Sequence, residues 1–377
     1  MSQRTKILVI AGTVIALFAA TGGVLAVASG SDDKKPKQQA ARTTSTTTTI
    51  PATTTTTPPI IAPLTGLVDP SGASVTRPAL SVKVENTPES RPQGGIDQAD
   101  VLYEEVVEGN ITRFVAIFNS SIPETVGPVR SVRAQDPDIV WPLGGIFVFS
   151  GGAQVNVNAV RAAPVTIVDE TIALSVPGAF ERNAAGQPPR SSPHNLYGHG
   201  PQLLSIGGDP KPPPALFEYL PADAPPVAGT GVLSTRIGFV SGYDPTYTWD
   251  PATRTWLRSM NGAPHTVVGG AQIAPTNVVV QFVDFNDGEG HPVGEGALWV
   301  FTDGVLRVGK WVRHDRAQAA KFYDAFGNPL HLRAGRTWVE LLPAGSAVDI
   351  VEAPPPTTVP TTVPPPTTTT KAKKKAK

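Results

Sequence analysis

Residues Asp97–Arg133 read DQADVLYEEVVEGNITRFVAIFNSSIPETVGPVRSVR, and this stretch decides the fold. It holds two segments rich in β-branched and aromatic residues, Val101–Val107 and Ile111–Phe118. Between them lies Gly109-Asn110, a dipeptide that is typical of a two-residue turn. The pattern therefore predicts a β-hairpin.

The charged residues of this hairpin admit a structural interpretation. A two-residue turn places Val106 opposite Arg113 and puts Glu104 and Glu108 diagonally across from Arg113 on one face of the sheet. The carboxylates would then neutralise an arginine that lies among apolar neighbours. This interpretation assigns Arg113 to a partly buried ion pair.

Arg130 and Arg133 introduce a functional interpretation. They lie three residues apart in GPVRSVR, so one helical turn would aim both side chains the same way. Together with Arg113 they would form a receptor for a carboxylate or a phosphate, because guanidinium groups bind these anions with paired hydrogen bonds. An ordinary solvated role for Arg130 or Arg133 remains open.

Composition divides the chain into a folded body and two tails. The 377 residues include 40 prolines and two Thr/Pro-rich tracts, so only part of the chain can pack a core, at about Leu64–Glu352. The net charge is zero, but bases outnumber acids in the tails and acids outnumber bases in the body. We therefore expect no nucleic-acid binding by the body, and we assign any polyanion contact to the tails.

The chain contains no cysteine. This excludes disulfides, thiol catalysis, zinc sites built from cysteine and attachment through a lipid-modified cysteine. The acidic, glycine-containing stretch Asp284–His291 has its glycine one place too early for a calcium-binding loop and predicts a hairpin tip instead. We predict no metal site and no cofactor.

Residues 1–30 predict a membrane anchor or a signal peptide. Ile7–Ala28 is uncharged and long enough to span a bilayer, which predicts a single-pass transmembrane helix with the folded domains outside the cytoplasm. The alternative is a secreted protein cleaved after Ala28, because Ala26-Val27-Ala28 is a small-residue cleavage site. The membrane is the predicted partner in the first case.

Two Thr/Pro-rich segments flank the body. Residues 31–63 predict a disordered stalk, and residues 353–377 predict a disordered tail with a Lys-rich end. The tail has two interpretations: a solvated spacer, or an electrostatic contact with anionic cell-wall polymers or lipid headgroups.

For the body we expect an α+β fold in two domains. Residues 64–210 predict a mixed α/β domain, and residues 211–352 predict an antiparallel β-rich domain, with the boundary at Lys211–Pro214. The first domain is expected to contain two further strands and one helix, at Pro78–Asn86, Ile146–Ser150 and Ala153–Arg161. The second is expected to contain strands at Thr276–Phe285, Ala297–Thr302, Val305–Val312 and Thr337–Leu342.

Two polar segments of the first domain each have two interpretations. His194 and Asn195 lie in the polar loop PPRSSPHNLY, where His194 could act as a general base or bind a ligand, although a loop histidine is more often a hydrogen-bonding fixture. Gly151-Gly152 precedes the expected helix and could bind an anion at the helix N-terminus, although a tight turn explains two glycines equally well.

The body contains the blocks RPALSVKVEN, RPQGGIDQADVLYE, EGNITRFVAIF, GPVRSVR, SPHNLY, TNVVVQ, GKWVR and FYDAFGNPLHLRAGRTWVELLP. These blocks resemble the YerB-like lipoprotein family, a domain of unknown function with N- and C-terminal parts. The resemblance implies an exported, membrane-tethered protein of two domains and implies no reaction. The chain departs from the family's usual anchoring because it has no cysteine to modify.

Two functions of different classes follow. The first is an envelope protein that binds an anionic wall-derived or peptide ligand in a cleft lined by Arg113, Arg130 and Arg133. The second is a cell-envelope hydrolase that uses Glu104 or Glu108 with His194 as acid and base, since common glycosidases need two nearby carboxylates. An open cleft that holds both glutamates, free of arginine, would favour the hydrolase.

Overall fold

The computed structural model describes residues 58–354 except 174, 208–210, 240–241 and 287, all of which belong to one compact unit of the chain. The transmembrane helix expected at Ile7–Ala28, most of the Thr/Pro stalk and the C-terminal tail lie outside the described residues. Within the described part, no helix has the length and apolar composition needed to cross a membrane.

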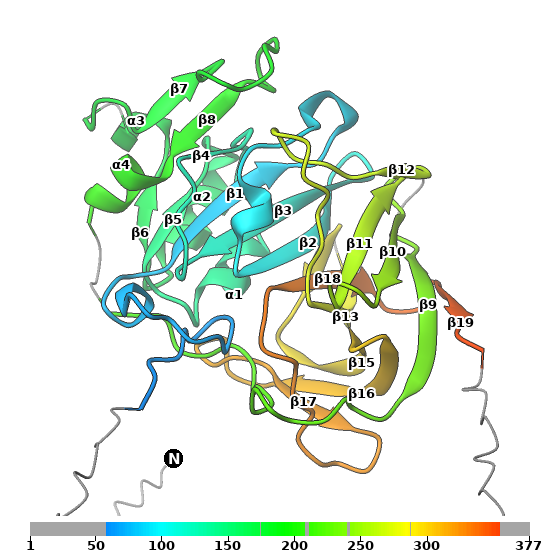
Figure 1. The fold of residues 1–377 in the computed structure, drawn as a ribbon. Helices are drawn as coiled ribbons and strands as arrows, with labels where there is room; N and C mark the ends of the chain where they lie inside the picture. The colour runs from blue at the N-terminus through cyan, green and yellow to red at the C-terminus, as the bar shows by residue number, and fades with distance from the viewer. Residues whose placement is uncertain (1–57, 174, 208–210, 240–241, 287, 355–377) are drawn as a thin grey trace, which may run out of the picture. The chain divides into compact units, whose positions relative to one another are not determined.

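Within the described residues, sixteen strands form one sheet and three strands form a second (Figure 1). The path of the large sheet is β12-β11-β10-β9-β16-β15-β13-β18-β2-β3-β1-β5-β6. Three further strands pair with members of this path: β14 with β13, β17 with β16, and β19 with β9.

The strands from the first half of the chain are β1 Leu80–Glu85, β2 Val101–Val107, β3 Ile111–Phe118, β4 Thr125–Val126, β5 Ile146–Val148, β6 Thr166–Val168, β7 Phe180–Arg182 and β8 Leu196–His199. Those from the second half are β9 Thr230–Ile237, β10 Pro245–Asp250, β11 Thr255–Met260, β12 Ala263–Pro264, β13 Asn277–Asn286, β14 Glu289–His291, β15 Gly294–Thr302, β16 Val305–Arg313, β17 Lys321–Asp324, β18 Thr337–Pro343 and β19 Val348–Glu352. The α-helices are α1 Asp136–Val140, α2 Gln154–Arg161, α3 Glu170–Ala173 and α4 Gly200–Ser205, and short 3₁₀ turns occur at Ala73–Val75, Pro88–Ser90 and Ile96–Gln98.

The expected α+β class is wrong. The described chain is mostly β, its helices are short, and the large sheet is mixed rather than antiparallel in its second half, because β13 pairs with β18 in parallel. On its other side β18 pairs in parallel with β2, so strands from both halves of the chain share one continuous sheet. Parallel pairing of strands that are far apart in sequence leaves no local pattern in the sequence. The strand patterns alone therefore predicted two domains of different classes.

The central hairpin forms as predicted, with a different register. The loop is Glu108-Gly109-Asn110, three residues long, and Arg113 pairs with Glu105 rather than with Val106. Because side chains alternate across a strand, this one-residue change moves Glu104 to the face opposite Arg113. Gly109 and Asn110 both have positive φ angles, 80° and 55°, which these residue types tolerate in a tight loop.

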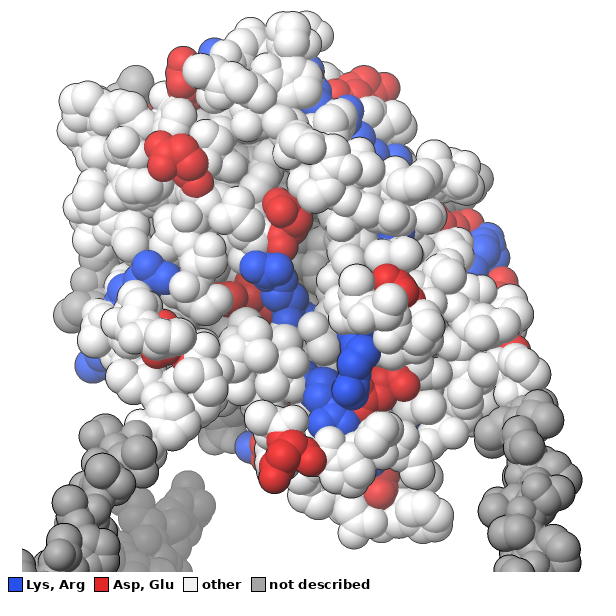
Figure 2. All heavy atoms as spheres, in the orientation of Figure 1, with Lys and Arg blue, Asp and Glu red and all other residues white. Residues whose placement is uncertain are grey.

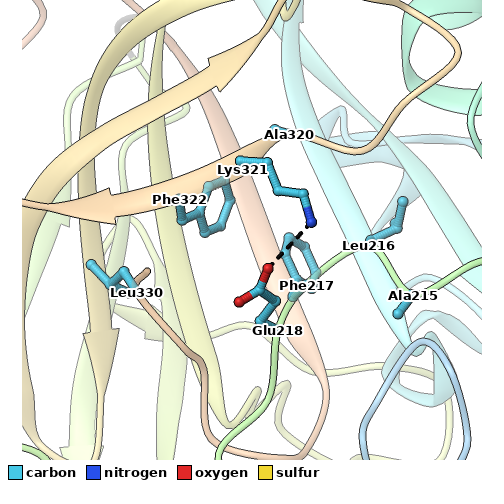
Figure 3. A pocket seen from close by; sticks show the side chains of 8 residues that line it. All are labelled: Ala215, Leu216, Phe217, Glu218, Ala320, Lys321, Phe322 and Leu330. Atoms are coloured by element: carbon cyan, nitrogen blue, oxygen red, sulfur yellow. Dashed lines mark hydrogen bonds and ion pairs between the residues drawn. The ribbon is translucent and has the colours of Figure 1, made fainter. Parts of the chain in front are cut away.

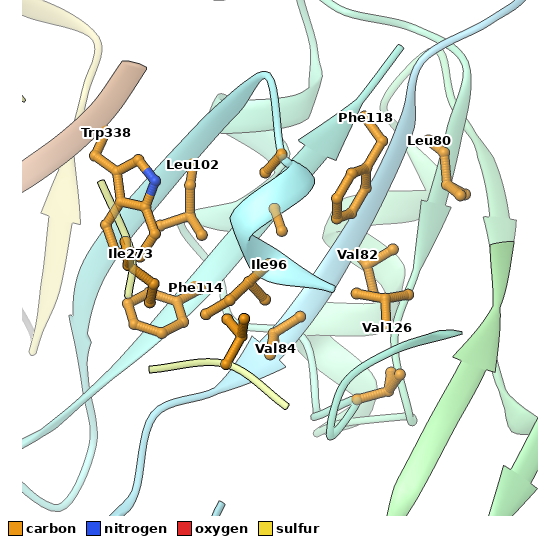
Figure 4. Packing of buried hydrophobic residues seen from close by; sticks show 14 of the residues in the cluster. Leu80, Val82, Val84, Ile96, Leu102, Phe114, Phe118, Val126, Ile273 and Trp338 are labelled. Carbon is orange, nitrogen blue, oxygen red and sulfur yellow. The ribbon is translucent and has the colours of Figure 1, made fainter. Parts of the chain in front are cut away.

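The sheet is buried on both faces around this hairpin. Every residue of β1 is buried, and the two faces of β3 contribute to two separate apolar clusters, of which β1 joins one. Figure 4 shows one of them, to which β1 contributes Leu80, Val82 and Val84. In the same cluster the ring of Phe114 packs against Trp338 with centroids 5.5 Å apart. Charged residues at the remaining positions of these strands must therefore find partners inside the protein.

One βαβ unit lies at the end of the large sheet. Strands β1, β5 and β6 are parallel, and α2 connects β5 to β6. The expected strand at Ile146–Ser150 and helix at Ala153–Arg161 correspond to β5 and α2. Gly151 and Gly152 lie in the connecting loop, at the carboxyl end of β5, where open parallel sheets commonly bind ligands.

Candidate functional site

Arg113 projects from β3 into the protein and is only 4 % exposed. Its Nη1 donates a hydrogen bond to the backbone oxygen of Ser131 at 3.0 Å, and its Nη2 lies 4.0 Å from a carboxylate oxygen of Glu108. Glu105 is its neighbour across the strand pair. Arg113 is thus a buried cation close to the loop that carries the other two candidate arginines.

Arg130 and Arg133 lie on an extended segment, not on the helical turn that was expected. This segment follows β4 and runs beside β1, where the backbone nitrogen of Arg130 donates to the oxygen of Lys83 at 2.9 Å. Arg130 Nε lies 3.2 Å from Glu85, and Arg133 forms an ion pair with Glu108. Pairing with β1 replaces the hydrogen bonds that a helix would have made.

The structure brings these three arginines together, and we call them the arginine cluster. Arg113 and Arg133 both donate to the backbone oxygen of Ser131, at 3.0 and 3.2 Å. Burial, and then the positive charges of Arg133 and Arg130, lower the pKa of Arg113 to about 10. Positive charge is therefore concentrated in the cluster, which disfavours the protonated form of Arg113.

Lys83 is a further cation beside the cluster that the sequence analysis did not single out. It is fully buried on β1 and forms ion pairs with Glu105 and, at 2.7 Å, with Asp136 at the start of α1. Burial lowers its pKa to about 8 against the opposing attraction of Asp136. The alternation of β1 puts Lys83 on the face opposite Leu80, Val82 and Val84, and this pattern does not indicate that the face is buried.

Several polar atoms around the cluster have unused hydrogen-bonding capacity. Among the described residues, Arg113 Nε, Arg130 Nε and Glu85 Oε1 are buried and make no hydrogen bond, although Arg130 and Glu85 form an ion pair. Next to them, Val132 donates to the backbone oxygen of Gly151, which places the loop before α2 beside the arginine-bearing segment. The first turn of α2 has no side-chain cap hydrogen bond.

Glu108 is the exposed member of the site. It lies in the hairpin loop with 64 % of its side chain exposed, and it contacts Arg133 and, more distantly, Arg113. Partial burial raises its pKa, but the hydrogen bond and charge of Arg133 outweigh this effect and the pKa is lowered. Glu108 is therefore a carboxylate bound to the arginine cluster from the solvent side.

His194 and Asn195 lie near the cluster, and each contacts a charged residue outside it. His194 Nδ1 is 3.0 Å from Glu85, the same carboxylate that pairs with Arg130. The side-chain oxygen of Asn195 accepts a hydrogen bond from Arg182 at 3.0 Å. His194 thus belongs to the rim of the site, whereas Asn195 holds the neighbouring strand β7.

Glu104 is not part of this site. It is fully buried on the opposite face of the sheet, where it forms an ion pair with Arg258 at 2.7 Å and accepts a hydrogen bond from Asn86 at 3.0 Å. Glu108 lies in the hairpin loop and His194 contacts Glu85, so the structure does not bring Glu104, Glu108 and His194 into one cleft. A hydrolytic pair of carboxylates is not assembled from these residues.

Glu104 belongs to a buried network that the sequence analysis missed. Its centre is Arg258 on β11, which contacts Glu104, Glu340, Tyr247 and, through Nε at 3.0 Å, His265 Nδ1. Burial and the adjacent charge of Glu104 raise the pKa of Glu340 well above its ordinary value, so this carboxyl keeps its proton. Burial and the charge of Arg258 keep His265 neutral by lowering its pKa.

The network joins distant parts of the chain. Glu104 and Glu340 are direct partners on the parallel strands β2 and β18, and the Arg258 guanidinium lies 4.9 Å from the ring centre of Trp338. The available sequence signal was the alternation in β11, where Trp256, Arg258 and Met260 are all buried. An arginine in such a pattern indicates a buried partner.

Among the described residues, no group of three or more histidine, aspartate or glutamate side chains is arranged to hold a metal ion. The charged and polar side chains of the site carry guanidinium, ammonium, imidazole and carboxylate groups. Such a set can bind an anion through charge-assisted hydrogen bonds.

Comparison with known proteins gives consistent matches. In sequence, 90 residues are 48 % identical to "Putative lipoprotein YerB" of Bacillus subtilis (strain 168), covering 24 % of this chain and 27 % of that protein. The matched segment thus spans about a quarter of that relative. In structure, the chain is similar to the crystal structure of YerB protein from Bacillus subtilis, with a TM-score of 0.64 and 25 % identity over 77 % of this chain and 99 % of that chain.

Two family domains match the body. Residues 64–209 match the N-terminal domain described as "Protein of unknown function (DUF3048)", and residues 235–339 match the C-terminal domain of the same family. The first match contains the arginine cluster, and the second contains Arg258. The chain therefore belongs to the DUF3048 family, and it is similar to YerB, as the resemblance in its sequence implied.

Proposed function

We propose that this protein is an extracytoplasmic envelope protein that binds an anionic ligand, either wall-derived or a peptide, at the arginine cluster. The observation that carries the proposal is the contact of exposed Glu108 with Arg133 and Arg113. A carboxylate on a loop already occupies the solvent side of the cluster. A ligand carboxylate or phosphate would take its place and use the same donors.

The surroundings of the cluster support an exchangeable anion. The inner carboxylates Glu85, Glu105 and Asp136 are buried and engaged by Arg130, Lys83 and His194, so they stay with the fold. Arg113 Nε makes no hydrogen bond to the described protein groups. The uncapped start of α2 adds backbone N–H groups close by.

The charge distribution favours local recognition over binding to a broad basic surface. On the face shown in Figure 2, basic side chains lie next to acidic ones within a mostly uncharged surface. A long polyanion that needs a continuous basic stripe is therefore a poor fit to this face. A short fragment with one carboxylate or phosphate fits a cluster of three arginines.

The proposed location rests on the name of the relative, "Putative lipoprotein YerB". We extend this to an extracytoplasmic position for the present chain. A reporter enzyme fused after Lys377 should be active outside the cytoplasm, and activity confined to the cytoplasm would contradict the proposed location.

Thermal unfolding in the presence of wall fragments tests the ligand. Glycerol phosphate and a muramic-acid peptide should raise the melting temperature of the wild-type body, because a ligand at about 100 times its dissociation constant stabilises by about 2.7 kcal/mol, or several degrees at this size. Arg130→Gln and Arg133→Gln should each lose at least half of the shift, and added salt should reduce it.

Arg236→Gln is the matched control. Arg236 is an exposed, ion-paired arginine on β9, and it pairs with Asp244 and Asp349 away from the cluster. Its variant should keep the full ligand-induced shift. Equal shifts in the wild type, the control and both cluster variants would exclude the arginine cluster as the binding site.

A further inference from the structure

The pocket beside β17 is largely filled by its own side chains. Figure 3 shows the rings of Phe217 and Phe322, whose centroids are 5.6 Å apart, next to the Glu218–Lys321 ion pair, whose atoms are 3.2 Å apart. Because rings at this separation are in contact, little space is left between them for a ligand. Within the described chain, accessible polar groups without a protein partner lie instead at the rim of the arginine cluster.

Glu85 holds two side chains at this rim. It is the last residue of β1 and is fully buried. Its Oε1 lies 3.2 Å from Nε of Arg130, and its Oε2 lies 3.0 Å from Nδ1 of His194. Because one carboxylate contacts both side chains, Arg130 and His194 are neighbours although they come from different segments of the chain.

The outer ends of both side chains are unpaired. Among the described residues, neither the terminal nitrogens of Arg130 nor Nε2 of His194 make a hydrogen bond, and none of these atoms is enclosed by the protein. The Arg130 side chain is 17 % exposed and the His194 side chain is 24 % exposed. A ligand at the rim can therefore reach both ends.

The two ends have opposite hydrogen-bonding character. Guanidinium nitrogens only donate, so those of Arg130 suit an anionic oxygen. A carboxylate only accepts, so Nδ1 of His194 donates to Glu85, and Nε2 presents a lone pair while the imidazole is neutral. Arg130 already balances the charge of Glu85, and no second carboxylate of the described chain forms an ion pair with His194. Nε2 is therefore suited to accept a hydrogen bond from a ligand hydroxyl.

The loop that carries His194 is fixed in place. The backbone nitrogen of His194 donates to the backbone oxygen of Ser191 at 3.0 Å. Arg190, in the same loop, donates to the backbone oxygen of Pro92 at 2.8 Å and to the hydroxyl of Tyr197. A loop held at both sides loses little conformational freedom when a ligand binds, so the imidazole is ready to take part in recognition.

We propose that the arginine cluster takes a hydroxylated anion, whose phosphate or carboxylate binds Arg130 and whose hydroxyl donates to Nε2 of His194. The hydroxyl lies one or two carbons from the anionic group, because Arg130 and His194 are held by the two oxygens of one carboxylate. This inference rests on the proposed function and names the chemical class of its ligand.

Matched pairs of ligands test the hydroxyl. In titration calorimetry with the full-length protein, glycerol 3-phosphate should bind about two- to tenfold more tightly than propyl phosphate, which has the same charge and chain length without the hydroxyls. Lactate and propionate form the corresponding carboxylate pair. The pair with the larger preference for the hydroxylated member identifies the anionic group.

His194→Asn tests the role of Nε2. The amide nitrogen of asparagine can replace Nδ1 against Glu85, but the side chain has no counterpart of Nε2. The preference for glycerol 3-phosphate over propyl phosphate should fall to about one, while the affinity for propyl phosphate should stay within about twofold of the wild type. A purely structural role for His194 would instead weaken both ligands alike and leave the preference unchanged.

His199→Asn is the matched control. His199 is also partly buried and contacts a carboxylate, that of Glu181 at 3.1 Å, but it does not contact Glu85. This variant should keep the preference. Equal affinities for the members of both pairs in the wild type, or a preference retained by His194→Asn, would overturn the inference and leave an anion site at the arginine cluster intact. No binding of any of the four ligands would contradict the proposed function as well.

Discussion

The charged residues of the central strands form a different ion-pair network on each face of the sheet. Lys83, Glu85, Glu104 and Glu105 are all buried, because β1 and β2 are covered on both sides. Two of these glutamates are adjacent in sequence, so they project to opposite faces. Glu105 joins Lys83 next to the arginine cluster, and Glu104 joins Arg258 in the buried network.

Removing Arg258 tests the buried network. Arg258→Leu leaves the Glu104 carboxylate without its ion-pair partner, and the free energy of unfolding should fall by about 3–5 kcal/mol in denaturant titrations. The double variant Arg258→Leu with Glu104→Leu should recover part of this loss, since no isolated charge then stays buried. A loss below about 1 kcal/mol in the single variant would show that the pair contributes little.

Among the elements, those with a local signal were predicted and those that depend on distant partners were not. The hairpin, the strand Leu80–Glu85 and the helix Gln154–Arg161 have clear periodicity and are confirmed, as are the strands at Asn277–Asn286 and Val305–Arg313. The hairpin register was wrong because the dipeptide Gly-Asn does not distinguish a two-residue from a three-residue loop.

The residues of the candidate site were likewise predicted only in part. The sequence grouped Arg113, Arg130 and Arg133, and the structure brings them together, although along an extended segment and not a helical turn. Lys83 and Asp136 could not be predicted as neighbours because they are 53 residues apart and meet only when α1 packs on β1. The role of the arginines in ligand binding stays a prediction.

Across the whole molecule, β18 is the element that joins the halves. It lies between β13 and β2 and pairs in parallel with both, over Thr337–Pro343 and Thr337–Leu341. The N-terminal family match ends at residue 209 and the C-terminal match begins at residue 235. The large sheet contains strands from both matched regions. A domain boundary near residue 210 stays a prediction, and the sheet suggests that the halves are stable only together.

Truncation tests this dependence. A protein of residues 58–354 should be soluble and should unfold in one cooperative thermal transition, because a single sheet connects its strands. Residues 64–209 alone should aggregate, since they expose the edge of β2 and leave Glu104 without Arg258. A monomeric, cooperatively folded 64–209 fragment in size-exclusion chromatography and calorimetry would contradict the expected dependence.

The affinity of Glu108→Gln for an anionic wall fragment tests the proposed binding site most directly. Glu108 is the exposed carboxylate that pairs with the arginine cluster, so removing its charge removes an internal competitor. Exposed ion pairs are worth up to about 1 kcal/mol, so titration calorimetry should show glycerol phosphate or a muramic-acid peptide binding about two- to fivefold more tightly than to the wild type. Adding Arg133→Gln to this variant should remove the gain. Unchanged or weaker binding by Glu108→Gln, or no binding by either protein, would contradict an anion site at the arginine cluster.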